Sequence, residues 1–230
     1  AGLRAVGGAM VVVDAVAGVQ HQTEKVCKMA NDYGLPRIVV INRMDRERAD
    51  FSRALDSLQR RLKGRLCPLQ VPIGAEAGFR GVVDLVKMKA ALVPDGKPRE
   101  AEIPGEVMDT AKEWREKLTE AVAETDDDLL AKYLEEGSIA EGELLGALRK
   151  AIASGTLVPV LAAAATRLIG IQPLMDLIVE EFPSPADVGA VEGTPTAQYH
   201  STNDFAVVKL DGRTGEERWR FLLNGAADDY

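Results

Sequence analysis

The chain has 230 residues, 46% of them hydrophobic and 28% charged, and its formal net charge is −8 at pH 7. This length allows one large domain or two small ones, and the acidic balance argues against a surface that coats nucleic acid in general, although a local basic contact with RNA is compatible with it. No apolar run reaches the roughly 18 residues of a membrane-spanning helix, and two histidines and two distant cysteines offer no metal-site spacing. We therefore expect no membrane partner, no DNA partner and no metal site, in a cytoplasmic chain with reduced cysteines.

The first third of the chain alternates between strand and helix patterns. Residues 9–16 form an apolar run typical of a strand covered on both faces, and residues 37–41 form another. Between and after them, apolar residues recur at helical spacing in residues 26–33 and 51–62, and Gly34 and Gly64 are expected to end these helices. Strand–helix–strand–helix with short loops predicts parallel βα units, in which ligands bind beyond the carboxyl ends of the strands.

A four-residue motif, Asn42, Arg43, Met44 and Asp45, follows directly after the second predicted strand. A carboxylate at Asp45 can accept two hydrogen bonds from the N1–H and amino group of guanine, whereas adenine offers no such donor pair. The Asn42 amide can hold neighbouring loops and meet the base, and the stem of Arg43 can lie over its face. The motif therefore predicts guanine recognition at the place where the fold rule puts a ligand.

The middle of the chain has a different pattern. Residues 66–86 read as strands interrupted by Gly and Pro, residues 94–98 as a turn, and residues 104–154 as an acidic, mostly helical block. Ser138 and Glu141 have the spacing of a capping box, which predicts a helix start at that serine. The acidic face of the block is interpreted as a solvated surface, with a docking role as the less favoured alternative; it comprises Glu113, Glu116, Glu120 and Glu124.

The strand pattern resumes at residues 156–162, is closed by Ala163, Ala164 and Ala165, and is followed by a helix pattern at 170–182. The chain is thus predicted to be an α/β protein whose parallel sheet has helices on both faces and carries a βα, mostly helical insertion. We expect an incomplete core at 1–70 and 156–187, an insertion at 71–155, and a linker with a β-hairpin tail at 188–230.

Several segments together resemble the G domain of elongation factor G and its close paralogues. They run in the family's order and spacing over roughly residues 3–187, and they comprise residues 12–20, 22–24, 36–46, 72–76, 81–90 and 170–185. The resemblance implies a P-loop-GTPase-type sheet, with an insertion opened by residues 84–90. It also implies a translational GTPase that binds the ribosome and uses GTP and GDP, with Mg²⁺, in translocation or ribosome recycling.

The resemblance also assigns binding residues. Asn42 and Asp45 match the family's guanine-specificity signature, while Arg43 stands in place of its usual Lys, which is not an equivalent side chain. Residues 163–165 stand where the family has Gly-Ser-Ala, whose backbone N–H groups face the guanine carbonyl. Ala165 matches that segment, and Ala164 has lost a hydroxyl group. The alternative interpretation of these alanines is a tightly packed strand end.

Two parts of a GTPase site do not occur among the 230 residues: the G-x-x-x-x-G-K-[ST] loop that cradles phosphates, and the family's Asp-x-Pro-Gly-His segment with its catalytic His. His21 is interpreted as a surface residue, so no catalytic residue is assigned. We expect a partial chain, beginning at Ala1 just downstream of that segment, with weak or no nucleotide binding and no hydrolysis of its own. The alternative is a non-hydrolysing G-domain remnant that docks on a protein or on the ribosome.

The tail does not follow the family pattern. Residues 203–221 predict a β-hairpin around a turn at 211–215, and they resemble one edge of a quinoprotein-type β-propeller blade, in which Leu-Asp-x-x-Thr-Gly-Glu precedes a Trp. One hairpin cannot bury its own face, so Trp219 and Phe221 are expected to be poorly covered. Two origins stay open: a divergent start of a barrel domain, or a joined or misassembled reading frame.

Overall fold

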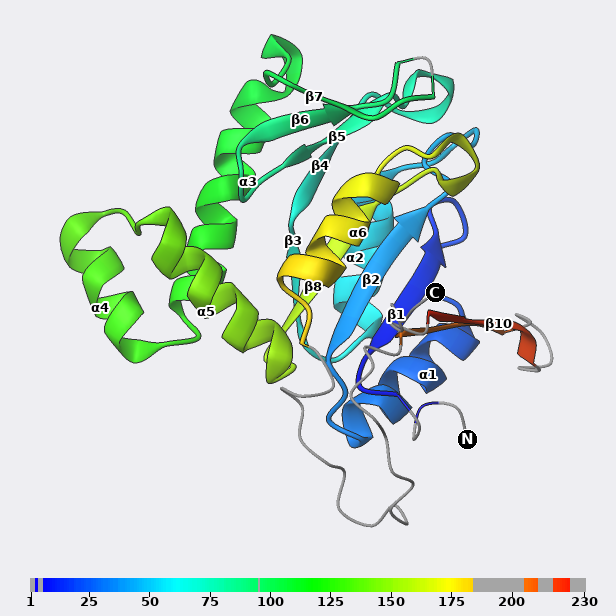
Figure 1. Cartoon of the computed structure of the whole chain (residues 1–230), viewed down its shortest axis with the longest axis horizontal. Helices are drawn as coiled ribbons and strands as arrows, with labels where there is room; N and C mark the ends of the chain where they lie inside the picture. The colour runs from blue at the N-terminus through cyan, green and yellow to red at the C-terminus, as the bar shows by residue number, and fades with distance from the viewer. Residues whose placement is uncertain (1–2, 4–5, 95, 184–204, 211–216, 224–230) are drawn as a thin grey trace, which may run out of the picture.

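The computed structural model of the protein describes residue 3, residues 6–94 and 96–183, and the backbone of 205–210 and 217–223. Its main sheet has four parallel strands in the order β1-β2-β8-β3 (Figure 1). These strands are β1 (Ala9–Asp14), β2 (Arg37–Asn42), β8 (Leu157–Ala162) and β3 (Arg65–Pro68). The predicted α/β class with a parallel sheet is confirmed.

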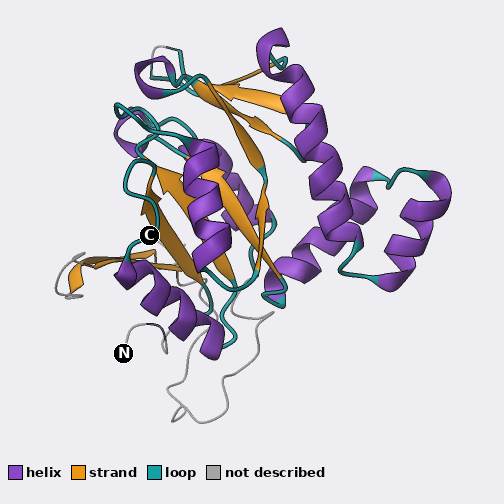
Figure 2. Ribbon diagram, turned by 180° about the vertical axis from the view of Figure 1, so that it is seen from behind, coloured by secondary structure: helices purple, strands orange, loops and turns teal. Residues whose placement is uncertain are grey.

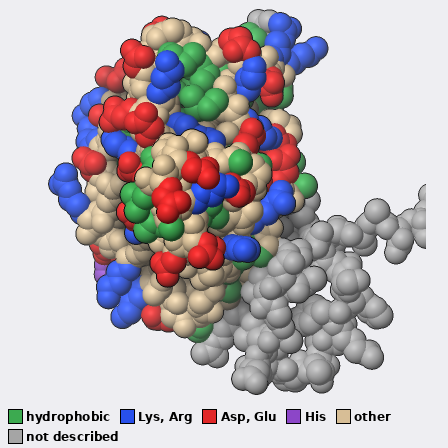
Figure 3. Space-filling model, turned by 90° about the vertical axis from the view of Figure 1, so that its left-hand side faces the viewer, with side chains coloured by type: hydrophobic (Ala, Val, Ile, Leu, Met, Phe, Trp, Pro, Cys, Tyr) green, Lys and Arg blue, Asp and Glu red, His purple; other side chains and the backbone are tan. Residues whose placement is uncertain are grey.

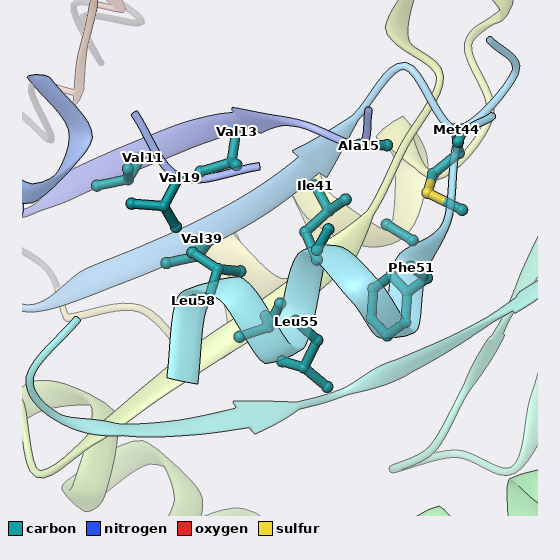
Figure 4. Packing of buried hydrophobic residues seen from close by; sticks show 14 of the residues in the cluster. Val11, Val13, Ala15, Val19, Val39, Ile41, Met44, Phe51, Leu55 and Leu58 are labelled. Atoms are coloured by element: carbon teal, nitrogen blue, oxygen red, sulfur yellow. The ribbon is translucent and has the colours of Figure 1, made fainter. Parts of the chain in front are cut away.

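Helices cover both faces of this sheet, as Figures 1 and 2 show. They are α1 (His21–Asp32) and α2 (Phe51–Arg61) on one face and α6 (Ile171–Glu180) on the other. On the first face, Leu55 and Leu58 of α2 pack with Val39 and Ile41 of β2 (Figure 4). On the second, Leu174 of α6 joins a smaller cluster. Because β2 and β8 are buried on both faces, their apolar runs show no alternation.

The segment between β3 and β8 forms a second layer, which we name the β4–α5 segment (residues 70–153). It contains an antiparallel meander in the order β4-β5-β6-β7, followed by three helices that pack with the meander in a second core, which also includes Cys67 of β3 and Leu157 of β8. The strands are β4 (Gln70–Ile73), β5 (Gly81–Asp84), β6 (Lys89–Leu92) and β7 (Arg99–Ala101), and the helices are α3 (Gly105–Ala123), α4 (Asp127–Glu136) and α5 (Glu141–Ala153). Only Leu69 separates β3 from β4, so one extended stretch passes from the main sheet into the meander.

Two predicted boundaries were wrong for local reasons. The first strand ends at Asp14 rather than at residue 16, because the Asp14 carboxylate accepts hydrogen bonds from the N–H groups of Val16 and Ala17 and turns the chain. The capping box at Ser138 does not form. Helix α5 begins after Ala140, which has an extended backbone (φ −63°, ψ 142°) and makes no side-chain cap.

The surface of the β4–α5 segment mixes both signs of charge, as Figure 3 shows for the side of the molecule that this segment forms. The four glutamates predicted to form a solvated face of α3 are all exposed. Lys117 pairs with Glu113 at 2.6 Å and Arg65 pairs with Glu124 at 2.6 Å, so the acidic face is partly neutralised. None of the described helices is both long and apolar enough to cross a membrane.

The predicted hairpin in the tail is confirmed as two antiparallel strands, β9 (Phe205–Leu210) and β10 (Glu217–Leu223), with Leu210 opposite Glu217. Its turn, the side chains of Trp219 and Phe221, the linker before residue 205 and the propeller resemblance lie outside the described residues.

Candidate guanine site

The candidate site lies at the carboxyl edge of the main sheet. The last residues of β1 and β2, Asp14 and Asn42, are register partners, and Ile41 pairs with Ala162 at the end of β8. The loops that follow these strands therefore leave the sheet at the same edge, which is where open parallel sheets bind ligands. This arrangement follows from three parallel strands of six residues each, ending at the same level.

Asn42 connects the loop after β2 to the loop after β8. Its Oδ1 accepts a hydrogen bond from the backbone N–H of Ala165 at 3.1 Å, and its backbone oxygen accepts one from Ala15 at 2.9 Å. Further along the same loop, the N–H of Met44 donates to the oxygen of Ala163 at 3.1 Å, and the Met44 side chain is only 1% exposed. The structure thus brings the two predicted motifs, which lie far apart in the sequence, into direct contact.

The carboxylate of Asp45 is half-buried at this edge. Within the part of the chain that the structure describes, it has no hydrogen-bond or ion-pair partner. A carboxylate without protein partners keeps all its acceptor positions for a ligand. A pair of N–H donors is the ligand feature that it could hold best, because a bidentate bond to a charged acceptor is among the strongest polar contacts in proteins.

The alanine loop is packed more tightly than the sequence alone indicates. Ala164 is fully buried, and it exchanges backbone hydrogen bonds with Ile169 at 3.0 and 3.2 Å. The N–H of Ala165 is also occupied, by Asn42. A guanine carbonyl here would have to share or displace the bond between Ala165 and Asn42. The structure therefore agrees with the alternative interpretation for Ala164, a tightly packed strand end. Guanine binding through the N–H group of Ala164 or Ala165 stays a prediction.

A tight turn closes this loop. It contains the 3₁₀ helix η3 (Ala165–Arg167), then Leu168 and Gly170, both with left-handed backbones at φ 58° and 76°. A Cβ atom on Gly170 would lie 2.2 Å from the backbone oxygen of Ala162, so only glycine fits.

The backbone of Arg43 is left-handed (φ 65°), a conformation that costs a non-glycine residue about 1 kcal/mol. Its guanidinium donates to Oδ2 of Asp14 at 2.9 Å, while Oδ1 of Asp14 accepts the N–H groups of Val16 and Ala17. Partial burial alone would raise the pKa of Asp14, but the bonds from Ala17 and Val16 and the Arg43 charge together lower it below its usual value. Asp14 was not among the predicted site residues, although a polar residue that ends a strand at this edge of the sheet is a usable signal.

A third loop braces the site. It contains the 3₁₀ helix η2 (Glu76–Gly78), and the Glu76 carboxylate accepts the backbone N–H of Arg48 at 2.8 Å. From the other side, the Arg167 guanidinium donates to the backbone oxygen of Ala77 at 3.5 Å. Both Arg48 (φ 64°) and Glu76 (φ 51°) have left-handed backbones, so this contact joins two constrained turns. The loops after β2, β4 and β8 therefore support one another.

Among the described residues, no group of three or more His, Cys, Asp or Glu side chains is arranged to hold a metal ion. The Mg²⁺ that the family resemblance implies is held in this fold class partly by the phosphate-binding loop, whose sequence does not occur among the 230 residues, so no step is assigned to a metal. His21, interpreted from sequence as a surface residue, has a side chain that is 92% exposed.

Comparison with known proteins gives the family of the chain. Residues 1–184 match the family described as the elongation factor Tu GTP binding domain. A crystal structure of ttk003000868 from Thermus thermophilus superimposes with a TM-score of 0.74 at 37% sequence identity, covering 80% of this chain and 28% of that protein. The chain thus spans less than a third of that protein's length. Since the family match covers most of the 230 residues, the chain belongs to the elongation factor Tu GTP binding domain family, the G domains of translational GTPases.

Proposed function

We propose that this chain is the base-reading part of an elongation-factor-G-like GTPase that acts on the ribosome, in translocation or in ribosome recycling, in the cytoplasm. The observation that carries the proposal is the Asp45 carboxylate, which has no hydrogen-bond or ion-pair partner among the described residues and lies three positions after Asn42, whose side chain bonds to Ala165. The family match supports guanine nucleotide as the ligand class. The division into a core at 1–70 and 156–187, an insertion at 71–155 and a tail from 188 is part of this proposal.

The proposed role of the chain is recognition of the base, with little hold on the phosphates. In this fold class the phosphates are held by the G-x-x-x-x-G-K-[ST] loop and by Mg²⁺, and the 230 residues contain no such loop. We therefore expect guanosine and GDP to bind with similar, weak affinity, and we expect no GTP hydrolysis by this chain. Sub-micromolar binding of GDP would contradict this part of the proposal.

Base selectivity tests the proposal most directly. The backbone amide signals of residues 42–45 and 163–165 would be followed by ¹⁵N NMR during titration with guanosine, inosine and adenosine. Guanosine should shift them at concentrations at which adenosine does not. Inosine, which lacks the exocyclic amine, should lie between the two. Equal responses to all three nucleosides would refute guanine reading.

A matched pair of variants assigns the selectivity to the carboxylate. Asp45→Asn should weaken guanosine binding by at least about tenfold, because hydrogen bonds to a charged group contribute about 1.5–3 kcal/mol. Asp109→Asn, which changes an exposed carboxylate on α3, should leave binding unchanged.

The alternative function, a non-hydrolysing remnant that docks on a protein or on the ribosome, is favoured by the absence of the phosphate-binding sequence from these residues. It predicts that the chain sediments with ribosomes and that Asp45→Asn does not change the bound fraction. Wild type and Asp45→Asn would be sedimented with purified ribosomes, with and without guanosine. Equal bound fractions in all four samples would favour docking over base recognition.

A further inference from the structure

We propose that Asp14 is a positioning residue of the guanine site, which holds Arg43 and thereby fixes the loop that presents Asp45 to the base. This inference rests on the proposed function, because it concerns the same site. It adds a residue from β1 to a motif that lies wholly after β2.

The fold places Asp14 beside the motif. Strands β1 and β2 are parallel neighbours, and their register pairs Asp14 with Asn42. The next residue after Asn42 is Arg43, so the Arg43 side chain starts one position beyond its partner carboxylate. The contact between them joins positions 29 residues apart in the sequence.

The Asp14 carboxylate is held in place independently of Arg43. Its Oδ1 accepts two backbone hydrogen bonds, from Val16 at 2.8 Å and from Ala17 at 3.0 Å, and this leaves Oδ2 to accept from the guanidinium at 2.9 Å. The side chain is 29% exposed, compared with 57% for Arg43. An exposed ion pair between two mobile side chains contributes little, but here one partner is already fixed, so less conformational freedom is lost on pairing.

Arg43 controls the direction of the chain into the site. With its left-handed backbone, the peptide turns so that the next residue, Met44, is buried and donates its N–H to Ala163. Asp45 then follows at the half-buried edge. The ion pair to Asp14 favours the conformation in which Arg43 accepts this backbone strain. It also fixes the position of the guanidinium. The loop is then ordered before the base binds, so little binding energy is spent on ordering the loop.

The first test needs no ligand. Asp14→Asn keeps an oxygen that can accept the N–H groups of Val16 and Ala17, but it removes the charge that binds Arg43. We expect hydrogen exchange at the Met44 amide to become about fivefold faster. The stabilisation by an ion pair with one ordered partner should lie near the upper end of the range measured for exposed ion pairs. Asp56→Asn removes an exposed helix pair with Arg60 (3.5 Å) instead and should leave Met44 unchanged.

The second test uses guanosine as the probe. Asp14→Asn should weaken guanosine binding by about fivefold, and Arg43→Gln should weaken it by at least as much, because it also shortens the stem that can lie over the base. The double variant should be no weaker than Arg43→Gln, because without the guanidinium Asp14→Asn has no contact left to remove. Arg43→Lys keeps a cation that can reach Asp14 and should retain most of the affinity. Thermal unfolding shows whether each variant is folded, and Arg43→Gln replaces Asp14→Asn if the latter is not.

The two proposals fail in different ways. Unchanged Met44 exchange in both Asp14→Asn and Arg43→Gln, or additive losses in the double variant, would overturn the positioning role alone. A wild-type protein that does not prefer guanosine to adenosine would overturn the proposed function. In that case faster Met44 exchange in Asp14→Asn would still support the positioning of this loop by Asp14.

Discussion

Gly170, in the turn that closes the alanine loop, offers a quantitative test of how the site is built. An alanine at this position would place its Cβ 2.2 Å from the oxygen of Ala162, 3.2 Å from Cα of Ala163 and 3.3 Å from the carbonyl carbon of Ala162. All three atoms belong to the backbone at the end of β8 and cannot be relieved by a rotamer change. The substitution must therefore move the strand end or distort the turn.

The cost of Gly170→Ala has two parts. The left-handed backbone (φ 76°) costs about 1 kcal/mol for any residue with a Cβ, and displacing closely packed atoms adds about 1–3 kcal/mol. We expect a total loss of about 3 kcal/mol in the free energy of unfolding, which corresponds to a lowering of the Tm by about 6–12 °C in a domain of this size.

Gly137 is the matched control. It ends α4 with nearly the same backbone (φ 70°), but a Cβ there would meet no atom within 4 Å. Gly137→Ala should therefore cost only the backbone term, about 1 kcal/mol. Changes in the unfolded chain are the same for both variants and cancel in the comparison.

Urea denaturation followed by circular dichroism measures both variants, with the slope m checked for equality. If Gly170→Ala and Gly137→Ala agree to within about 0.5 kcal/mol, the close approach of Gly170 to β8 does not matter and the reasoning is wrong. A difference of about 2 kcal/mol would support it. Guanosine titration adds a functional reading, because a displaced strand end moves Ala163 and Ala165.

Three other regions give predictions that can be checked on the same protein. Arg37 is buried and donates through one guanidinium nitrogen to the backbone oxygen of Cys27 at 3.2 Å and through the other to Asn31 at 3.1 Å. Arg37→Lys replaces these two nitrogens with one and should lower the free energy of unfolding, measured in urea, by about 2 kcal/mol, whereas an unchanged value would contradict this role. Burial raises the pKa of Asp84 despite hydrogen bonds from two backbone N–H groups, so the folded state binds its proton more tightly and stability falls as pH rises through the raised pKa. Asp84→Asn should therefore gain stability relative to the wild type as the pH rises from the ordinary aspartate pKa of about 3.9 through the raised pKa, and a difference that does not change with pH would refute the reasoning. Burial also raises the pKa of Cys27 to about 11 and of Cys67 to about 12; neither thiol should react with Ellman's reagent at about pH 8 until urea unfolds the chain, and fast reaction in native buffer would show that burial is incomplete.

The core of the fold could be predicted because its signal is local. The strands around Val39 and Val160 have apolar interiors without alternation, and the helix carrying Leu55 and Leu58 has a strict helical period, so pattern and burial agree. The position of the candidate site then follows from the rule for parallel sheets. Asn42 and Asp45 were predicted from the chemistry of guanine, and the structure places both at this edge of the sheet; their binding role stays a prediction.

Features that depend on contacts between distant residues could not be predicted. The hydrogen bond between Ala165 and Asn42 and the ion pair between Arg43 and Asp14 depend on which strands are neighbours and on their register. The failed capping box at Ser138 shows a related limit. Four residues can satisfy a local rule, but Gly137 ends α4 with a left-handed backbone and the link to Ala140 stays extended.

The single residue between β3 and β4 has a mechanical consequence. The β4–α5 segment is connected to the main sheet by Leu69 at one end and by the short link from α5 into β8 at the other, and β3 and β8 are hydrogen-bonded parallel neighbours. A pull on the segment along these strands would load their hydrogen bonds together, in shear, instead of opening them one at a time. Ala163 follows β8 directly, and its backbone oxygen accepts the N–H of Met44, so we expect tension on β8 to reach the candidate guanine loop.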